Sequence, residues 1–131
     1  MPKGETKLGE LELEVLKVIW EREPATVPDV AEVMAASRGS AKTTTLTVMQ
    51  RLHAKGYLKR RKRGGIFHYS TTEKRGRVMS RLVSQFVGTV LDGSALPFVA
   101  YLAETKGLSK EQAAALRRIV REVEDQPGEE H

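Results

Sequence analysis

The sequence has no cysteine and few aromatic residues among its 131 positions. Without cysteine, the chain can form no disulfide, thiolate zinc site, iron–sulfur cluster or thiol nucleophile. No apolar run approaches the roughly 18 residues that a membrane helix requires, and the polar first seven residues lack the apolar segment of a secretory signal. We therefore expect a cytoplasmic protein, with one domain or one small domain plus an oligomerisation segment.

Acidic residues are missing from one long block of the chain. Residues 33–72 contain nine Lys or Arg and no Asp or Glu, whereas residues 1–32 contain four basic and eight acidic residues. Residues 73–131 contain nine of each sign, and the net charge is +5. A block of this length without a carboxylate predicts a surface that is free of repulsion against a polyanion.

Side-chain patterns suited to catalysis or to a cofactor are also scarce. The three histidines, His53, His68 and His131, show no metal-ligand spacing, and no serine lies in a nucleophile elbow. The glycines form no phosphate-binding loop. We expect no enzymatic activity, no metal site and no cofactor.

The first half of the chain has apolar residues at helical spacing. This spacing predicts a helix over residues 9–22, a second that Thr26 caps and that ends near residue 36, and a third over residues 41–55. Two runs, residues 57–63 and 66–71, flank Gly64-Gly65 and predict a β-hairpin.

Only helices are predicted after the hairpin. The first is expected to begin with Thr72 as its cap and to reach residue 91, and the second to begin with Ser94 and to reach residue 106. A capping box of Ser109 and Gln112 opens the last helix, and residues 126–131 are expected to be a frayed tail.

This order predicts a mainly α fold with a small β-hairpin. Three helices and a two-stranded hairpin form a winged helix-turn-helix domain, which we place at residues 1–72. Residues 73–131 form a helical region too small for an independent core. Its apolar faces must be buried against the first domain or against another copy of the chain, and we predict that it is a dimerisation region.

The third helix is the candidate DNA-reading element. Its core face is predicted from Ala41, Thr45, Val48, Met49 and Leu52. Its outward face has no acid, and the residues near its N-terminus are of the kind that recognition helices direct at base edges. The predicted DNA-binding residues on this helix are Lys42, Thr43, Thr44, Thr47, Gln50 and Arg51, of which Thr43, Thr47 and Gln50 are expected to contact bases.

The hairpin is expected to act as a wing that contacts the DNA backbone or the minor groove. Its first strand carries five consecutive cations, which strand alternation sends to both faces, so that those near the tip are best placed. A solubilising edge strand would explain part of the same pattern. The predicted wing contacts are Arg60, Arg61, Lys62, Arg63 and His68.

Four stretches of the chain resemble the penicillinase-repressor family of winged-helix regulators of beta-lactamase and methicillin-resistance genes. They cover about residues 8–124. The stretches are Leu8-Gly9-Glu10-Leu11-Glu12 with Ile19-Trp20, Ala41-Lys42-Thr43-Thr44 with Val48-Met49-Gln50-Arg51-Leu52, Lys55-Gly56-Tyr57-Leu58-Lys59-Arg60 with Tyr69-Ser70, and Phe98-Val99 through Leu108-Ser109 with Leu116-Arg117.

The resemblance implies a repressor that binds an inverted-repeat operator as a homodimer. It further implies that the genes under its control form a regulon of the beta-lactam-resistance type. A regulatory protease is a further possible partner, although Tyr101-Leu102 stand where beta-lactam-responsive members have their Asn–Phe cleavage site. Lys42 replaces the family's usual aromatic residue, which predicts a different operator. The apolar residues that we assign to the dimer interface are Val83, Phe86, Val87, Val90, Leu91, Phe98, Val99, Leu102, Leu116, Ile119, Val120 and Val123.

Two alternative functions share parts of this pattern. A winged-helix repressor of another regulon that senses a small molecule would show every feature above. A winged-helix module for protein–protein interaction would carry a basic hairpin for solubility alone. Salt-dependent binding to duplex DNA separates the last alternative from the other two functions.

Overall fold

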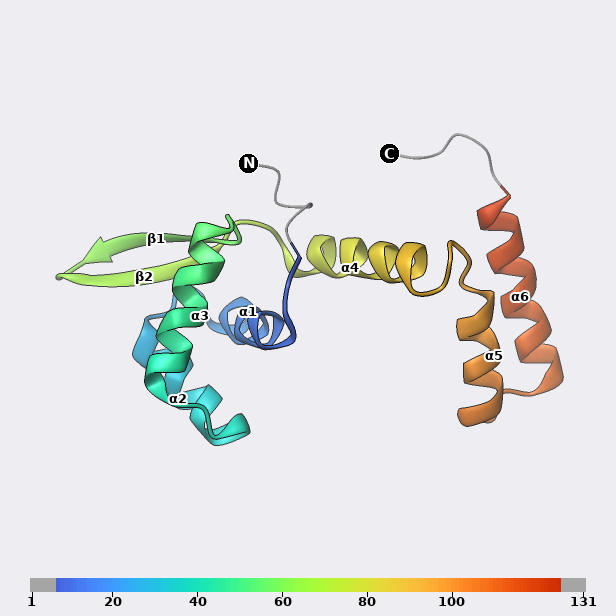
Figure 1. Cartoon of the computed structure of the whole chain (residues 1–131), viewed down its shortest axis with the longest axis horizontal. Helices are drawn as coiled ribbons and strands as arrows, with labels where there is room; N and C mark the ends of the chain where they lie inside the picture. Colours follow the sequence, from blue (N-terminus) through green and yellow to red (C-terminus); the bar gives the residue numbers. More distant parts are fainter. Residues whose placement is uncertain (1–6, 126–131) are drawn as a thin grey trace. The chain divides into compact units, whose positions relative to one another are not determined.

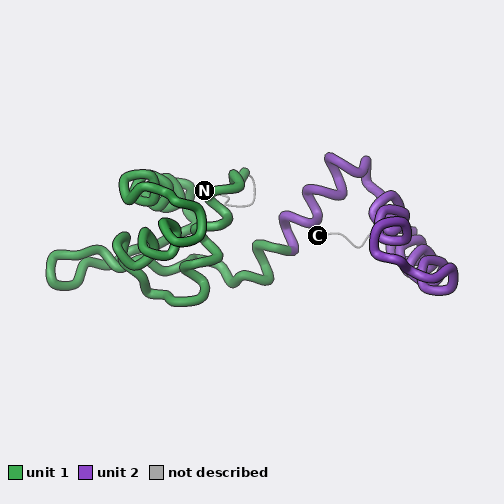
Figure 2. Tube along the Cα trace, turned by 90° about the horizontal axis from the view of Figure 1, so that it is seen from below, with its two compact units in different colours: residues 1–79 green, residues 80–131 purple. Residues whose placement is uncertain are grey.

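The computed structural model describes residues 7–125, so residues 1–6 and the predicted tail at 126–131 lie outside the described part. It confirms a mainly α fold with one hairpin (Figure 1). The elements are α1 (Glu10–Arg22), α2 (Val27–Arg38), α3 (Lys42–Ala54), β1 (Leu58–Arg63), β2 (Ile66–Thr71), α4 (Arg75–Thr89), α5 (Leu96–Thr105) and α6 (Lys110–Glu124). The chain divides into two compact units, residues 1–79 and 80–131 (Figure 2).

The first unit has one core, which the three N-terminal helices share with the base of the hairpin. Each helix buries the apolar residues that lie three or four positions apart, so that α1 and α2 both pack against α3. The aromatic residues Tyr57 and Tyr69 close the core on the side of the hairpin. The buried members are Val15, Leu16, Ile19, Ala25, Val30, Met34, Val48, Met49, Leu52, Tyr57, Leu58 and Tyr69.

A capping box fixes the start of α2. The Thr26 hydroxyl accepts a hydrogen bond from the Asp29 amide at 3.2 Å, and the Asp29 carboxylate accepts one from the Thr26 amide at 3.0 Å. The hydrogen bond from the Thr26 amide to the carboxylate, together with a smaller contribution from the Thr26 side chain, lowers the pKa of Asp29 below its ordinary value. The helix continues through Arg38, two residues beyond the predicted end near residue 36, because its C-cap Gly39 adopts the left-handed conformation only at that point.

The hairpin is joined to the helical core by backbone pairing between residues that are far apart in the sequence. Gly64 and Gly65 form its turn with φ values of 59° and 80°, a conformation that glycine adopts without strain. Ala25, between α1 and α2, pairs with Tyr69 through hydrogen bonds of 2.9 and 2.8 Å. The Glu23 carboxylate also accepts a hydrogen bond from the Thr71 amide at 2.7 Å. The base of the hairpin is therefore held against the loop between α1 and α2.

The first unit extends into α4, which begins later than predicted. Thr72 does not cap this helix, because its hydroxyl donates to the Gly56 carbonyl at 2.8 Å. The Trp20 indole donates to the Glu73 carbonyl at 3.1 Å, and Val78 is buried. The division into compact units thus falls inside α4, and the domain boundary that we predict between residues 72 and 73 stays a prediction.

In the second unit, α5 and α6 lie side by side (Figure 1). Ser109 and Gln112 form the predicted capping box of α6. The N-cap of α5 is Ala95, and the Ser94 hydroxyl accepts a hydrogen bond at 3.1 Å from the amide of Leu96, the first residue of the helix. Glu124 accepts hydrogen bonds from the Ser94 hydroxyl at 3.0 Å and from the Ala95 amide at 2.8 Å. These contacts connect the start of α5 to the end of α6.

Candidate nucleic-acid interface

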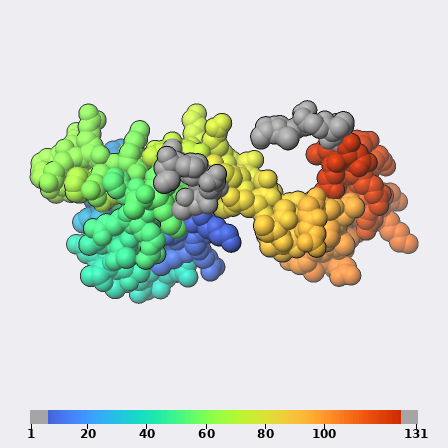
Figure 3. All heavy atoms as spheres, turned by 45° about the horizontal axis from the view of Figure 1, so that its top comes forward, coloured from blue at the N-terminus to red at the C-terminus, as the bar shows by residue number. Residues whose placement is uncertain are grey.

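One side of α3 is open to solvent along its whole length. The buried side consists of Thr45, Val48, Met49 and Leu52, as predicted, but Ala41 is exposed and not part of it because it is the N-cap residue. All six predicted DNA-binding residues of this helix are exposed: Lys42, Thr43, Thr44, Thr47, Gln50 and Arg51. In Figure 3, the hairpin forms the outer end of the first unit, and the surface of α3 continues from its base on the same face.

Leu46 also belongs to this open side, although the sequence analysis did not single it out. Its side chain is 38% exposed. Helical spacing places it next to Thr43 and Gln50. An exposed leucine among threonines supplies the apolar contact that a thymine methyl group accepts. The signal in the sequence was its position, which lies outside the buried stripe of α3.

The open side of α3 borders α1 in a shallow depression of about 310 Å³. Its lining comes from both helices, with Leu11 on α1 facing the threonines of α3. The residues that line it are Leu11, Thr43, Thr44, Thr47, Val48 and Arg51.

A buried carboxylate connects α1 to the end of α3. Glu12 is 4% exposed, and its carboxylate accepts hydrogen bonds of 2.8 and 3.0 Å from the Lys55 ammonium and one of 2.8 Å from the Gly9 amide. The Arg51 guanidinium lies 3.8 Å from the same carboxylate. Glu12 therefore fixes the end of α3 against α1.

The charges around Glu12 determine its ionisation. Burial by itself raises the pKa of Glu12, but the hydrogen bonds from Lys55 and Gly9 and the charges of Lys55 and Arg51 outweigh burial and lower the pKa below the ordinary value of 4.5. We did not identify this residue as functional from the sequence. The available signal was an acid at the helical spacing of Val15, Leu16 and Ile19, which are all buried.

The buried side of α3 contains one polar atom without a partner. Among the residues that the structure describes, the Thr45 hydroxyl makes no hydrogen bond, and its side chain is 1% exposed. We expect Thr45→Val to raise the free energy of unfolding by about 1 kcal/mol, because it replaces an unsatisfied hydroxyl with a methyl group of similar shape. Chemical denaturation measures this change, with Thr47→Val as an exposed control at which stability stays the same. A loss of stability in Thr45→Val would show that the hydroxyl has a partner.

The register of the hairpin separates its cations into two sets. Arg60 pairs with Tyr69 and Lys62 with Phe67, so these four side chains share the face on which Tyr69 is buried. The opposite face has its own paired residues, which are Lys59 with Ser70, Arg61 with His68, and Arg63 with Ile66. Lys59 and all four predicted wing cations are exposed, and His68 is half-buried.

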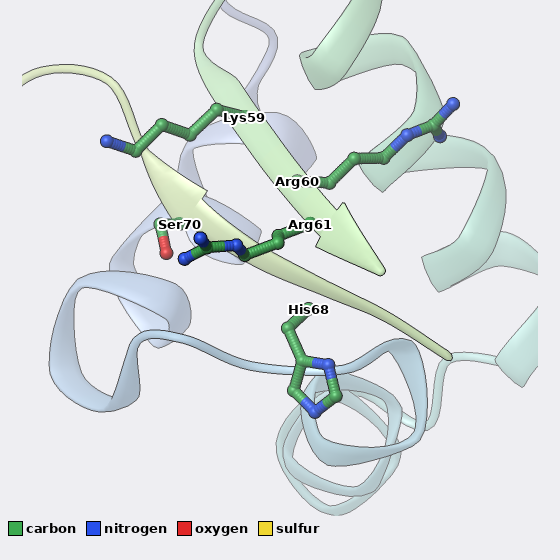
Figure 4. A pocket seen from close by; sticks show the side chains of 5 residues that line it. All are labelled: Lys59, Arg60, Arg61, His68 and Ser70. Atoms are coloured by element: carbon green, nitrogen blue, oxygen red, sulfur yellow. The ribbon is translucent and has the colours of Figure 1, made fainter. Parts of the chain in front are cut away.

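A cavity of about 420 Å³ lies along the hairpin and has no acidic residue in its lining. Figure 4 shows Arg61 extending toward Ser70, whereas Arg60 points to the other side of the strand. The His68 Nδ1 lies 3.1 Å from the Ile66 carbonyl. The lining residues are Lys59, Arg60, Arg61, His68 and Ser70.

Within residues 7–125, no group of three or more His, Asp or Glu side chains could hold a metal ion. Across the same range, no helix combines the length and the apolar character needed to cross a membrane.

The second unit exposes a set of large apolar side chains. Val99, a predicted member of the dimer interface, is buried inside this unit, at 4% exposure in the single chain. Five others of the assigned residues are half-buried, namely Val87, Leu91, Leu102, Leu116 and Val120. The six that remain exposed are Val83, Phe86, Val90, Phe98, Ile119 and Val123. Tyr101 is also exposed, with its ring stacked on Phe98 at 6.1 Å.

Comparison with known proteins gives consistent matches over most of the chain. The model of the penicillinase repressor family matches residues 8–122. The transcriptional regulator BlaI of Mycobacterium tuberculosis is 33% identical over 121 residues, which cover 91% of this chain and 86% of that protein. The methicillin resistance regulatory protein MecI of Mammaliicoccus sciuri is 25% identical over 114 residues, covering 87% of this chain and 93% of that protein. A solution structure of Bacillus licheniformis BlaI with the blaP half-operator matches 54% of this chain and 87% of that chain, with 28% identity and a TM-score of 0.49.

Proposed function

This chain belongs to the penicillinase repressor family, and we propose that it represses transcription as a homodimer bound to an inverted-repeat operator. As a member of that family, it is a DNA-binding transcriptional regulator and not an enzyme. By analogy with BlaI and MecI, its target genes are of the beta-lactam-resistance type. Because its ligand is chromosomal DNA, we place it in the cytoplasm.

The observation that carries this proposal is the continuous acid-free stretch that forms the open side of α3 and both strands of the hairpin. Residues 33–72 contain nine basic residues and no carboxylate, and the structure exposes the outward side chains of α3 and the wing cations to solvent. Such a surface attracts the phosphate backbone of DNA and meets no repulsion from its own acids.

We assign the reading of bases to α3. Thr43, Thr47 and Gln50 follow one another at helical spacing on its exposed side. Threonine donates to or accepts from base edges, and glutamine pairs with adenine in the major groove. Lys42, at the start of the helix, is suited to a phosphate contact. Leu46 adds an apolar contact beside these polar ones.

The remaining predicted contacts hold the backbone and set the register of the helix on the duplex. They come from two elements, with Thr44 and Arg51 on α3 beside α1 and the others on the hairpin. Phosphate contacts of this kind give affinity without sequence preference. The proposed backbone contacts are Thr44, Arg51, Arg60, Arg61, Lys62, Arg63 and His68.

A dimer is proposed because the second unit exposes apolar side chains on α4, α5 and α6. Two identical winged units related by a twofold axis read two half-sites with inverted symmetry. Tyr101 is exposed on α5, at the position where the family resemblance puts the cleavage site of beta-lactam-responsive members. We propose a regulatory protease as a further partner, which would bind this region.

Selection of duplexes from a random-sequence pool with the intact protein tests the proposal. We expect enrichment of an inverted repeat with half-sites about 10 base pairs, or a multiple of this, apart. Affinity for the enriched duplex should fall steeply with salt, by a slope of about 0.9 for each phosphate contact. A pool with no enriched sequence, or binding without salt dependence, contradicts the proposed function.

Thr47→Ala is expected to weaken binding to the enriched duplex by about 1–3 kcal/mol while binding to random duplexes stays nearly the same. Alanine is a better helix former than threonine, so a loss cannot come from a weaker helix. Titration of both duplexes with the variant measures the difference. Equal losses on both duplexes would show that Thr47 holds the backbone and does not read a base.

A further inference from the structure

The cations on the two faces of the hairpin have different surroundings. The face that carries Tyr69 is packed against α3, with the Tyr69 and His53 rings 6.5 Å apart in an edge-to-face arrangement. His53 lies in the last turn of α3, so this face of the hairpin adjoins the helix. Arg60 and Lys62 share it, because strand alternation and the register place both on the side of Tyr69.

An exposed aromatic ring brings these two cations together. Phe67 is 36% exposed, and its ring centroid lies 4.1 Å from the Arg60 guanidinium carbon and 5.1 Å from the Lys62 ammonium. Both distances fall within the range of a cation–π interaction. The same ring meets the buried Tyr69 edge-to-face at 6.4 Å, so it is itself held by the core.

Arg60 has a second contact with the same group of aromatic residues. Its Nη1 donates to the Tyr69 hydroxyl at 3.4 Å. Among the described residues, none of the three cations on the opposite face of the hairpin, Lys59, Arg61 and Arg63, forms an aromatic or ion-pair contact. Arg60 is therefore the most restricted of the wing cations before any DNA is bound.

We propose that Phe67 is a positioning residue, which holds Arg60 and Lys62 on the α3 side of the wing for contact with DNA phosphates. This inference rests on the proposed DNA-binding function. It assigns unequal shares of the wing's affinity for DNA to the cations on its two faces. Long basic side chains lose rotamer freedom when they bind, and a side chain that is already restricted loses less. Arg60 and Lys62 thus supply a larger share of the wing's affinity than Lys59 and Arg61 do.

The test compares variants of both faces by titration with a random-sequence duplex over a range of salt concentrations. Phe67→Leu should weaken binding about three- to tenfold, as expected for the loss of one or two exposed cation–π contacts. Phe67→Tyr, which keeps the ring, should bind like the original protein. Ile66→Ala, an exposed apolar position on the opposite face, is the matched control and should also bind normally.

A double-variant comparison separates positioning from a structural role. In a chain that already carries Arg60→Ala and Lys62→Ala, Phe67→Leu should cause no further loss, because it acts through those cations. Arg60→Lys should weaken binding, whereas Arg61→Lys should not, since only Arg60 depends on a stacked guanidinium. Thermal melting of each variant shows whether the fold is intact. If Phe67→Leu fails to fold, the comparison of Arg60→Lys with Arg61→Lys tests the inference in its place.

Three results would overturn the inference. These are normal binding by Phe67→Leu, an undiminished loss in the chain without Arg60 and Lys62, and equal effects of Arg60→Lys and Arg61→Lys. Failure of the original protein to bind duplex DNA in a salt-dependent way would instead contradict the proposed function itself.

Discussion

Glu12→Ala is expected to lower the free energy of unfolding of the first unit by about 2–4 kcal/mol. The substitution leaves the Lys55 ammonium without its carboxylate partner and removes the acceptor of the Gly9 amide. Breaking a fully buried ion pair costs about 3–5 kcal/mol, and we expect less here because a quarter of the Lys55 side chain is exposed. The single tryptophan, Trp20, lies in this unit, so its fluorescence during urea unfolding reports the change.

The same variant should lose its effect in acid. The pKa of Glu12 in the folded chain lies below its ordinary value of 4.5, so the carboxylate contributes stability fully above about pH 4.5. This contribution disappears as the pH falls through the lower pKa of the folded state. The difference in stability between the original protein and Glu12→Ala should therefore be large at neutral pH and shrink as the pH falls below about 4.5.

Glu14→Ala provides the matched control on the same helix. Glu14 pairs with Arg38 at 3.2 Å, but both side chains are more than a third exposed. Surface pairs of this kind contribute about 0–1 kcal/mol. Glu12, Gly9, Lys55 and Arg51 form what we call the Glu12 network. Equal losses of stability in the two variants, or a stability difference that does not change with pH, would show that this network does not stabilise the fold as we infer.

The Glu12 network is a feature of the fold that could not be predicted from the sequence. The starts and ends of α1, α3 and the hairpin follow from local signals such as helical spacing, Gly56 and Gly64-Gly65, and the structure confirms them within a residue or two. The contact between Glu12 and Lys55 joins positions 43 residues apart. Its existence depends on how α1 crosses α3, which no local pattern specifies.

The wing gives a second example of the same limit. Alternation along β1 predicts two sets of cations, but it does not say which set faces α3. That choice depends on the burial of Tyr69 against the core and on its pairing with Arg60. Phe67 acquires its contacts with Arg60 and Lys62 only through this register, which is why it was missed when the sequence was considered alone.

Apolar spacing in the second unit could not separate contacts within the chain from contacts between chains. Val99 and Ile119 both lie on apolar stripes, yet Val99 is buried inside the unit and Ile119 is 54% exposed. Helical spacing gives the direction of a side chain but not its partner. The exposed apolar residues of the second unit are therefore the positions at which a substitution tests the dimer.

Ile119→Glu is expected to convert the protein into a monomer and to weaken binding to an inverted-repeat operator by about 10²–10⁴-fold. Ile119 is exposed in the single chain, so a carboxylate at this position should not disturb the unit itself. In a dimer interface the same carboxylate would be buried without a partner, which strongly disfavours association. Two linked binding units gain about 10²–10⁴-fold in affinity over one, and the monomer loses that gain.

Arg121→Glu is the control for this experiment, because Arg121 is exposed and helical spacing places it on the opposite side of α6 from Ile119. It changes the net charge more than Ile119→Glu does, yet it should leave the dimer and the operator affinity nearly unchanged. Sedimentation velocity at micromolar concentration gives the state of each variant, with 14.6 kDa expected for the monomer. If Ile119→Glu stays dimeric, then Ile119 does not lie in the dimer interface. If the original protein sediments as a monomer and still binds the inverted repeat tightly, then the dimer proposal is wrong and repression rests on the winged unit of a single chain.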